Sequence, residues 1–120
     1  MTDDRPAITH PLPDELVELI AGRFRALSEP VRIKLVDRLL HDGEATVADL
    51  TDAIGTTQQN VSKHLGVLLQ SGIATRRKQG SFAYYRVTDP GVAELCATVC
   101  DSLQRHVEYL ARAVELSASA

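Results

Sequence analysis

Residues 56–87 read TTQQNVSKHLGVLLQSGIATRRKQGSFAYYRV, and this stretch decides the fold. In its first half, apolar side chains recur at helical spacing behind a threonine that can cap a helix. This pattern predicts a helix over about residues 57–71, with Gly72 as its stop. After Gly72 the apolar period falls to two, and a Lys-Gln-Gly-Ser turn separates two runs rich in β-forming residues. The second half is therefore predicted to be a β-hairpin over residues 73–87.

A short amphipathic helix is predicted directly before this one. Thr46 and Asp49 have the spacing of a capping box, with an aspartate in place of the longer acid. An apolar face follows, made of Val47, Leu50 and Ile54. Gly55 then ends the helix. Two helices joined by a tight glycine-containing turn are a helix-turn-helix arrangement, here followed by the hairpin as a wing.

Two further helices are predicted upstream, one over residues 13–26 and one from Pro30 to a glycine stop at Gly43. The buried face expected of the second consists of Val31, Ile33, Leu35, Val36, Leu39 and Leu40. A last helix is predicted over residues 89–116. Its apolar stripe consists of Val92, Leu95, Cys96, Val99, Cys100, Leu103, Val107, Leu110 and Val114. A stripe of this length is too long for so small a core to cover, which suggests dimerisation.

The composition is that of one globular domain. With 120 residues, of which 44% are hydrophobic and 24% charged, the chain can bury one modest core. We expect a flexible arm over residues 1–12 and a folded domain over residues 13–116, mainly α with a small β-hairpin, as in a winged helix-turn-helix. Neither a signal segment nor a membrane span is recognisable, so a cytoplasmic protein with no membrane partner is expected.

Charge is distributed unevenly along the chain, although the formal net charge is only −3. Residues 56–88 contain five basic and no acidic residues, whereas the rest of the chain contains eight basic and 16 acidic ones. A local charge of +5 beside −8 elsewhere is typical of a surface that meets a polyanion while the other surfaces stay away from it. The alternative is an ordinary solvated charged face.

The predicted second helix of the pair presents polar side chains suited to a DNA groove. Val61, Leu65 and Leu68 face inward on a helical wheel, so the polar residues turn toward solvent. Glutamine can bond an adenine edge twice, lysine can reach guanine or phosphate, and no carboxylate is present to repel the backbone. The basic residues before the hairpin turn are placed to meet phosphate or the minor groove. The candidate DNA-binding residues from this pattern are Thr57, Gln58, Gln59, Ser62, Lys63, Arg76, Arg77 and Lys78.

Several segments together resemble the ArsR/SmtB family of bacterial winged-helix repressors, over nearly the whole chain. They are FRALSEPVRIKLV at 24–36, VADLT at 47–51, QNVSKHLGVL at 59–68, GIA at 72–74 and RKQGSFAYYRV at 77–87. The resemblance implies a homodimer built on the first and last helices that binds two-fold double-stranded operator DNA. It further implies release of that DNA when a metal ion, metalloid or oxidant modifies a sensor site. Ser62, Lys63 and His64 coincide with the family's recognition-helix signature, so the resemblance implies DNA contact at these three positions and adds His64 to the candidate DNA-binding residues.

The sensor sites of the family do not carry over. One uses a cysteine pair before the recognition helix, but residues 49–60 contain no cysteine. Another uses acidic and histidine ligands on the last helix, and in an ungapped alignment only Asp89 matches it. The other three positions hold Gly91, Ser102 and Arg105. We therefore expect no obligatory cofactor. We also do not expect the zinc or nickel site of the family in this chain.

Cys96 and Cys100 remain as a pair one helical turn apart on the last helix. Trivalent arsenic takes three thiolates and tetrahedral zinc or cadmium takes four ligands, so an ion bound here needs more ligands. These come from the partner chain or from Asp101, His106 or His10. The alternatives are a thiol redox switch, in which an interchain disulfide is favoured over one within a regular helix, and cysteines that simply pack in the apolar stripe.

A repressor released by a thiophilic metal or metalloid such as arsenite or cadmium is the function we favour from the sequence. A redox-sensing repressor is one alternative, and a winged-helix protein-interaction module without an inducer is another. An enzyme is not expected, because a cysteine in an apolar helical stripe lacks the oxyanion donors and the cleft that catalysis needs.

Overall fold

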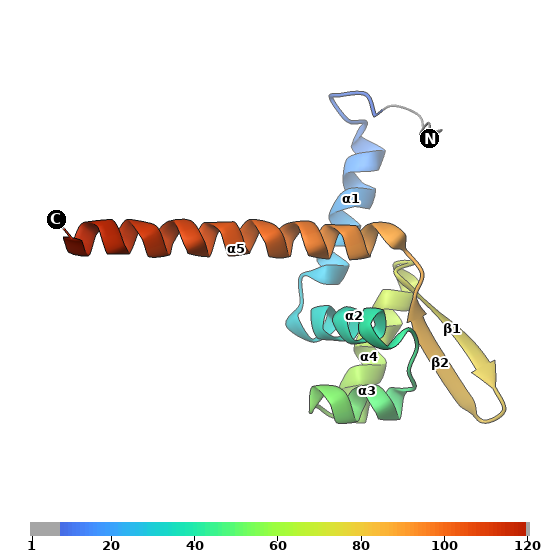
Figure 1. Cartoon of the computed structure of the whole chain (residues 1–120). Coiled ribbons are helices and arrows are strands. Elements are labelled where there is room, and N and C mark those ends of the chain that lie inside the picture. The colour runs from blue at the N-terminus through green and yellow to red at the C-terminus, as the bar shows by residue number, and fades with distance from the viewer. Residues whose placement is uncertain (1–7, 120) are drawn as a thin grey trace, which may run out of the picture.

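The computed structural model describes residues 8–119 and shows a winged helix-turn-helix with a long last helix (Figure 1). The elements in order are α1 (Asp14–Leu27), α2 (Pro30–Asp42), α3 (Val47–Ile54), α4 (Gln58–Gln70), β1 (Ala74–Gln79), β2 (Phe82–Val87) and α5 (Pro90–Ser119). Of the arm expected over residues 1–12, residues 1–7 lie outside the described part of the chain. Residues 8–13 precede α1 without helix or strand.

The helix boundaries follow from local capping chemistry. The capping box predicted at α3 is confirmed, since the Asp49 amide donates to Thr46 Oγ1 and the Thr46 amide donates to Asp49 Oδ2, both at 3.2 Å. The Asn60 amide donates to Thr57 Oγ1 at 3.1 Å and so begins α4. Gly55 ends α3 in the left-handed region, at φ 78°, where a side chain would be strained.

The core lies between α2, α3, α4 and the base of the hairpin. Its largest fully buried side chains are Leu35, Leu39, Leu50, Leu65, Leu68, Ile73, Val36, Val61 and Val92. Two residues expected on the buried face of α2 are not there, because Ile33 is 48% exposed and Leu40 is 42% exposed. Both side chains therefore lie on the part of α2 that its neighbouring elements leave open to solvent, and the prediction of their burial is wrong.

The hairpin is an antiparallel pair in which Ala74 lies opposite Val87 and Arg77 opposite Tyr84. A third backbone segment extends it at the base. Ala45, in the loop before α3, exchanges two main-chain hydrogen bonds with Tyr85, at 3.1 and 2.9 Å. The wing is therefore joined directly to the start of the helix-turn-helix.

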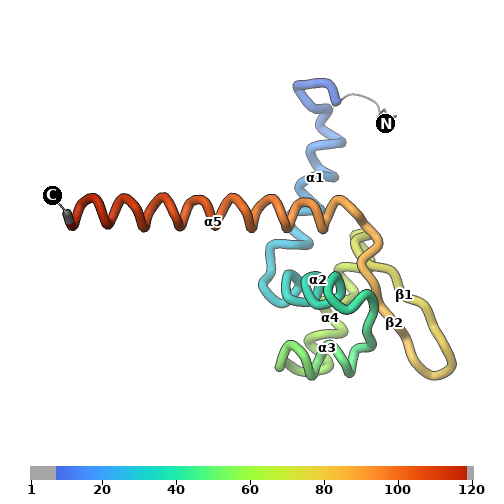
Figure 2. The backbone as a smooth tube through the Cα atoms, viewed as in Figure 1, coloured from blue at the N-terminus to red at the C-terminus, as the bar shows by residue number. Residues whose placement is uncertain are grey.

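The long helix α5 extends far beyond the core, past the point where it crosses α1, and gives the molecule dimensions of 65 × 40 × 31 Å (Figures 1 and 2). Only its first turns touch the core, through Val92, Leu95 and Cys96. The rest of its stripe is exposed in the single chain, namely Val99, Leu103, Val107, Leu110 and Val114. Large apolar side chains are also exposed on α1, namely Leu16, Val17, Leu19, Ile20 and Phe24. No helix among residues 8–119 has the length and apolar character needed to cross a membrane.

Candidate nucleic-acid interface and sensor residues

The solvent face of α4 carries a narrow stripe of small and polar residues. Gln59, Ser62, Lys63 and Gly66 follow one another at helical spacing, and all four are exposed. Gln58 and the capping residue Thr57 are exposed at the N-terminal end of the same helix. The inward side of α4 is buried in the core, as the sequence predicts. The stripe offers hydrogen-bond donors, acceptors and one cation, with no carboxylate.

His64 is not part of this stripe, which corrects its sequence-based placement among the DNA-binding residues. The residue is only 7% exposed, and its Nδ1 lies 2.9 Å from Nη1 of Arg32. Its Nε2 lies 3.7 Å from a carboxylate oxygen of Glu29. The helical spacing contains the signal for this burial, because His64 falls three residues after Val61 and four before Leu68.

The three cations before the hairpin turn divide between its two faces. Arg76 and Lys78 share one face, whereas Arg77 lies on the other, because side chains alternate along a strand. Arg77 donates to both carboxylate oxygens of Glu44, at 3.0 and 2.6 Å, and its guanidinium lies 4.6 Å from the ring centre of Tyr84. Arg77 is thus already paired, which leaves Arg76 and Lys78 as the cations available to a phosphate.

The Glu44–Arg77 pair also shifts the ionisation of both partners. The hydrogen bonds from Arg77 lower the pKa of Glu44, and those same bonds to Glu44 raise the pKa of Arg77. Glu44 lies 33 residues from Arg77, so no local pattern in the sequence indicates this pairing. Both side chains stay charged at neutral pH, so the pair holds the wing against the loop before α3.

Comparisons with known proteins agree with this architecture. A family described as a helix-turn-helix domain matches residues 27–77. The biofilm growth-associated repressor of Xylella fastidiosa is 37% identical over 93 residues, covering 78% of this chain and 81% of that protein. The arsenical resistance operon repressor of Bacillus subtilis is 32% identical over 87 residues, and this match covers 68% of this chain and 83% of that protein. The chain belongs to the ArsR family.

A solved structure supports the same assignment of fold. The homodimeric winged helix-turn-helix DNA-binding domain of a possible ArsR-family regulator from Mycobacterium bovis superimposes with a TM-score of 0.72 and 28% identity. The match covers 84% of this chain and 95% of that one. The chain is accordingly a transcriptional repressor of the ArsR family, and the two curated relatives described above are themselves named as repressors.

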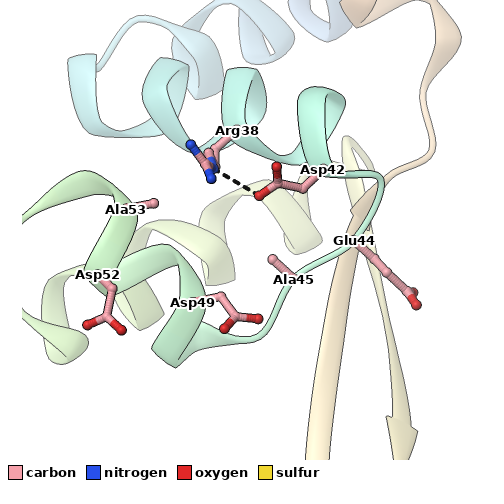
Figure 3. Close-up of a pocket in the computed structure, with 7 residues that line it drawn as sticks. All are labelled: Arg38, Asp42, Glu44, Ala45, Asp49, Asp52 and Ala53. Atoms are coloured by element: carbon pink, nitrogen blue, oxygen red, sulfur yellow. Dashed lines mark hydrogen bonds and ion pairs between the residues drawn. The ribbon is translucent and has the colours of Figure 1, made fainter.

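Carboxylates gather in a pocket of this ArsR-family protein between α2, α3 and the loop that joins them, yet most of them are already engaged (Figure 3). Asp42 accepts from His41 and from Arg38, each at 2.9 Å, and these bonds lower its pKa. Asp49 belongs to the capping box, and Glu44 points away toward the wing. Within residues 8–119 no group of three or more His, Cys, Asp or Glu side chains could hold a metal ion.

Cys96 and Cys100 are both free thiols in different surroundings. Cys96 is partly buried against the core, whereas Cys100 is exposed. Burial raises the pKa of the Cys96 thiol, and the negative charge of Asp37 on α2 raises it further. The thiol of Cys96 is therefore protonated at neutral pH, which slows its oxidation, because the thiolate is the reactive form. The other ligands considered from the sequence, His10, Asp101 and His106, are exposed.

Asp89, which matches a ligand position of the family, is also engaged in this chain. Its carboxylate forms an ion pair with Arg23 of α1 and accepts a hydrogen bond from the Gly91 amide at 2.9 Å. The pair joins the end of the wing to α1, so Asp89 has a structural partner where a metal ligand would need an open lone pair. Any ion held by the cysteines needs ligands from a second chain.

Proposed function

We propose that this chain is a cytoplasmic homodimeric repressor that inserts α4 into the major groove of a two-fold operator. The observation that carries the proposal is the exposed stripe of α4, which lacks a carboxylate and is accompanied on the wing by two exposed cations, Arg76 and Lys78, that have no ion-pair partner within residues 8–119. The proposed DNA contacts are Thr57, Gln58, Gln59, Ser62, Lys63, Arg76 and Lys78. Thr57 can still donate its hydroxyl proton to a phosphate, because its cap bond uses the oxygen as acceptor.

A second copy of the chain is the proposed cover for the apolar faces of α1 and α5. These faces are exposed over several turns of both helices, which is costly in water for an isolated chain. Pairing them places two copies of α4 on one side of the dimer. Half-sites read by such a dimer lie about one helical turn of DNA apart, roughly 34 Å. The homodimeric relative from Mycobacterium bovis supports this arrangement.

The proposed inducer is a thiophilic ion, arsenite or cadmium, held by Cys96 and Cys100 with ligands from the partner chain. Two thiols on one face of α5 are too few for either ion, but two copies across the dimer supply four. The raised pKa of the Cys96 thiol favours an ion, which displaces the proton on binding, over an oxidant that needs the thiolate already formed. The arsenical repressor among the relatives supports the same class of ligand.

The test uses DNA selected by the purified reduced protein from a random-sequence pool. Binding is then titrated with arsenite, cadmium, zinc or a mild oxidant while free thiols are counted. We expect arsenite or cadmium to weaken binding about tenfold or more, with loss of free thiols under reducing conditions. If only the oxidant releases the protein from DNA, and a reductant restores binding, the sensor is a thiol redox switch and not an ion-binding site. If the protein selects no DNA at low salt, the proposal that it is a DNA-binding repressor is wrong.

Replacing Cys96→Ser together with Cys100→Ser should remove the response to the ion. A serine hydroxyl does not replace a thiolate as a soft ligand, so the ratio of affinities with and without the ion should fall to about one. Fluorescence anisotropy with the selected DNA measures both affinities. Thr98→Ser, on the same helix, is the matched control and should keep the full response. An undiminished response in the double variant would place the sensor elsewhere.

Gly66→Ala should stabilise the free protein while weakening its binding to DNA. No atom lies within 4 Å of the position its new methyl group would take, so the substitution fits the free chain. Alanine in a helix interior is favoured over glycine by about 0.5–1 kcal/mol, and the free energy of unfolding in urea should rise by that amount. Operator affinity should fall several-fold, because Gly66 lies in the groove-facing stripe.

Gly22→Ala in α1 is the control for this substitution. Gly22 is also helical, and a methyl group there meets only the end of the Arg25 side chain, at 3.6 Å. The control should gain similar stability and keep full DNA affinity. Equal affinities for the Gly66 variant and the control would show that DNA does not approach this part of α4.

A further inference from the structure

One partly buried polar cluster, with His64 as its buried member, has no part in the DNA contacts proposed above. It consists of Arg32 at the start of α2, His64 on the inward side of α4, and Glu29, which caps α2. His64 is the only charged or polar residue that is buried among those the structure describes. Buried polar groups are costly unless they are bonded, so this cluster holds its members in defined positions.

Arg32 connects the end of α1 to the middle of α4. Its Nε donates to the Ala26 carbonyl at 2.6 Å and its Nη2 to the Arg25 carbonyl at 3.2 Å, both in the last turn of α1. Its Nη1 lies 2.9 Å from Nδ1 of His64. The fork of one guanidinium thus engages two helices that are not neighbours in sequence, and its planar geometry fixes their relative position.

The chemistry of the contact also fixes the imidazole. A guanidinium has donors only, so Nδ1 of His64 must accept, and the ring proton lies on Nε2. Nε2 faces the carboxylate of Glu29, at 3.7 Å. Glu29 in turn accepts from the amides of Val31 and Arg32, at 2.8 and 3.2 Å. Both ring nitrogens therefore have an assigned partner, and the ring is restrained against rotation.

We propose that Arg32 and His64 are positioning residues for DNA recognition, because their contact sets the rotation of α4 about its own axis relative to α1. His64 directly follows Ser62 and Lys63 in the chain, so fixing its ring on the inner side of α4 fixes the direction of the outer stripe. The inference rests on the proposed function, in which this stripe meets the groove. It adds a link between a helix of the proposed dimer interface and the helix that reads DNA.

The competing interpretation is that the pair merely stabilises the fold, and two substitutions of His64 separate the two ideas. His64→Gln keeps an acceptor for Arg32 and a donor toward Glu29, so its operator affinity should stay within about twofold of the unmodified protein. His64→Leu fills the space but leaves the guanidinium without its acceptor, and its affinity should fall about tenfold. It should also unfold at a lower temperature.

The decisive variant combines Arg32→Met with His64→Leu. It removes the guanidinium that His64→Leu leaves without an acceptor, but it also removes the bonds from Arg32 to the Ala26 and Arg25 carbonyls, so its melting temperature should rise only part of the way from that of His64→Leu. Its operator affinity should stay about tenfold weak, because the bond that orients α4 is absent. If affinity instead recovers together with the melting temperature, the pair has only a structural role and the inference is wrong.

Lys63→Ala, measured on the same selected DNA, distinguishes the failure of this inference from failure of the proposed function. Lys63 lies on the outer stripe and makes no contact in the Arg32–His64 cluster. Weak binding by Lys63→Ala with full binding by His64→Leu would overturn the inference and leave the DNA interface intact. Full binding by Lys63→Ala would overturn the interface, and the inference with it.

Discussion

Leu103→Glu should make the protein monomeric and abolish its binding to a two-fold DNA site. Leu103 is 59% exposed and lies at the centre of the apolar stripe of α5. In a dimer the stripes of two chains would bury this position, and a carboxylate there would lose its hydration twice per dimer without a partner. A single chain carries one α4, so the gain from engaging two half-sites together is lost. That gain is typically 100-fold or more in affinity.

Sedimentation equilibrium measures the mass of the variant, and anisotropy with the selected DNA measures its affinity. Thr98→Glu is the matched control, since it adds the same charge to an exposed position on the opposite side of α5. The control should remain a dimer with full affinity. Circular dichroism should show both variants folded, because neither side chain belongs to the core. A dimeric Leu103→Glu protein would mean that another surface makes the dimer.

Replacing Arg76→Ala together with Lys78→Ala should give the largest change in salt dependence. These cations share one face of the wing and have no carboxylate partner within the described chain. A dimer loses four positive charges, so the slope of log affinity against log salt should become shallower by about 3–4 if all four meet phosphate. Affinity at low salt should fall more than tenfold.

The slope is obtained by measuring the affinity for DNA at several potassium chloride concentrations, from about 50 to about 300 mM. This range is wide enough to tell such slopes apart. Lys34→Ala combined with Arg112→Ala removes the same number of charges from exposed positions outside the proposed interface, on α2 and α5. This control should keep the original slope. An equal loss of slope in both double variants would mean that overall charge, and not contact by the wing, governs the salt dependence.

Much of the fold could be predicted because its signals are local. The capping box at Thr46, the cap at Thr57 and the glycine stop at Gly55 each involve residues a few positions apart, and all appear in the structure. The change of apolar period after α4 likewise marks the start of the hairpin within a few residues. Such features depend on the chain near them, so a single sequence is enough to find them.

The pairings that define the site were harder to predict because they join distant parts of the chain. The family's recognition-helix signature predicts that His64 contacts DNA, yet the side chain is buried and bonded to Arg32, which lies 32 residues away. The charge of Arg77 predicts a contact with phosphate, yet its guanidinium is paired with the carboxylate of Glu44, in the loop before α3. Polarity alone does not tell whether a side chain meets a ligand or another part of its own chain.

The two main-chain hydrogen bonds between Ala45 and Tyr85 bear on how a small movement at the dimer interface could be enlarged at the DNA. They join the wing to the helix-turn-helix, so we expect the two parts to move as one rigid body when one half of the proposed dimer tilts against the other. If the two stripes of the proposed dimer are spaced like the half-sites, each lies about 17 Å from the dimer axis, and a tilt of about 3° moves it by about 1 Å. That displacement exceeds the range of donor–acceptor distances in good N–H···O hydrogen bonds, which is about 0.5 Å wide. A small change in the angle between the two halves, started by a ligand at Cys96, should therefore weaken the DNA contacts of both copies of α4.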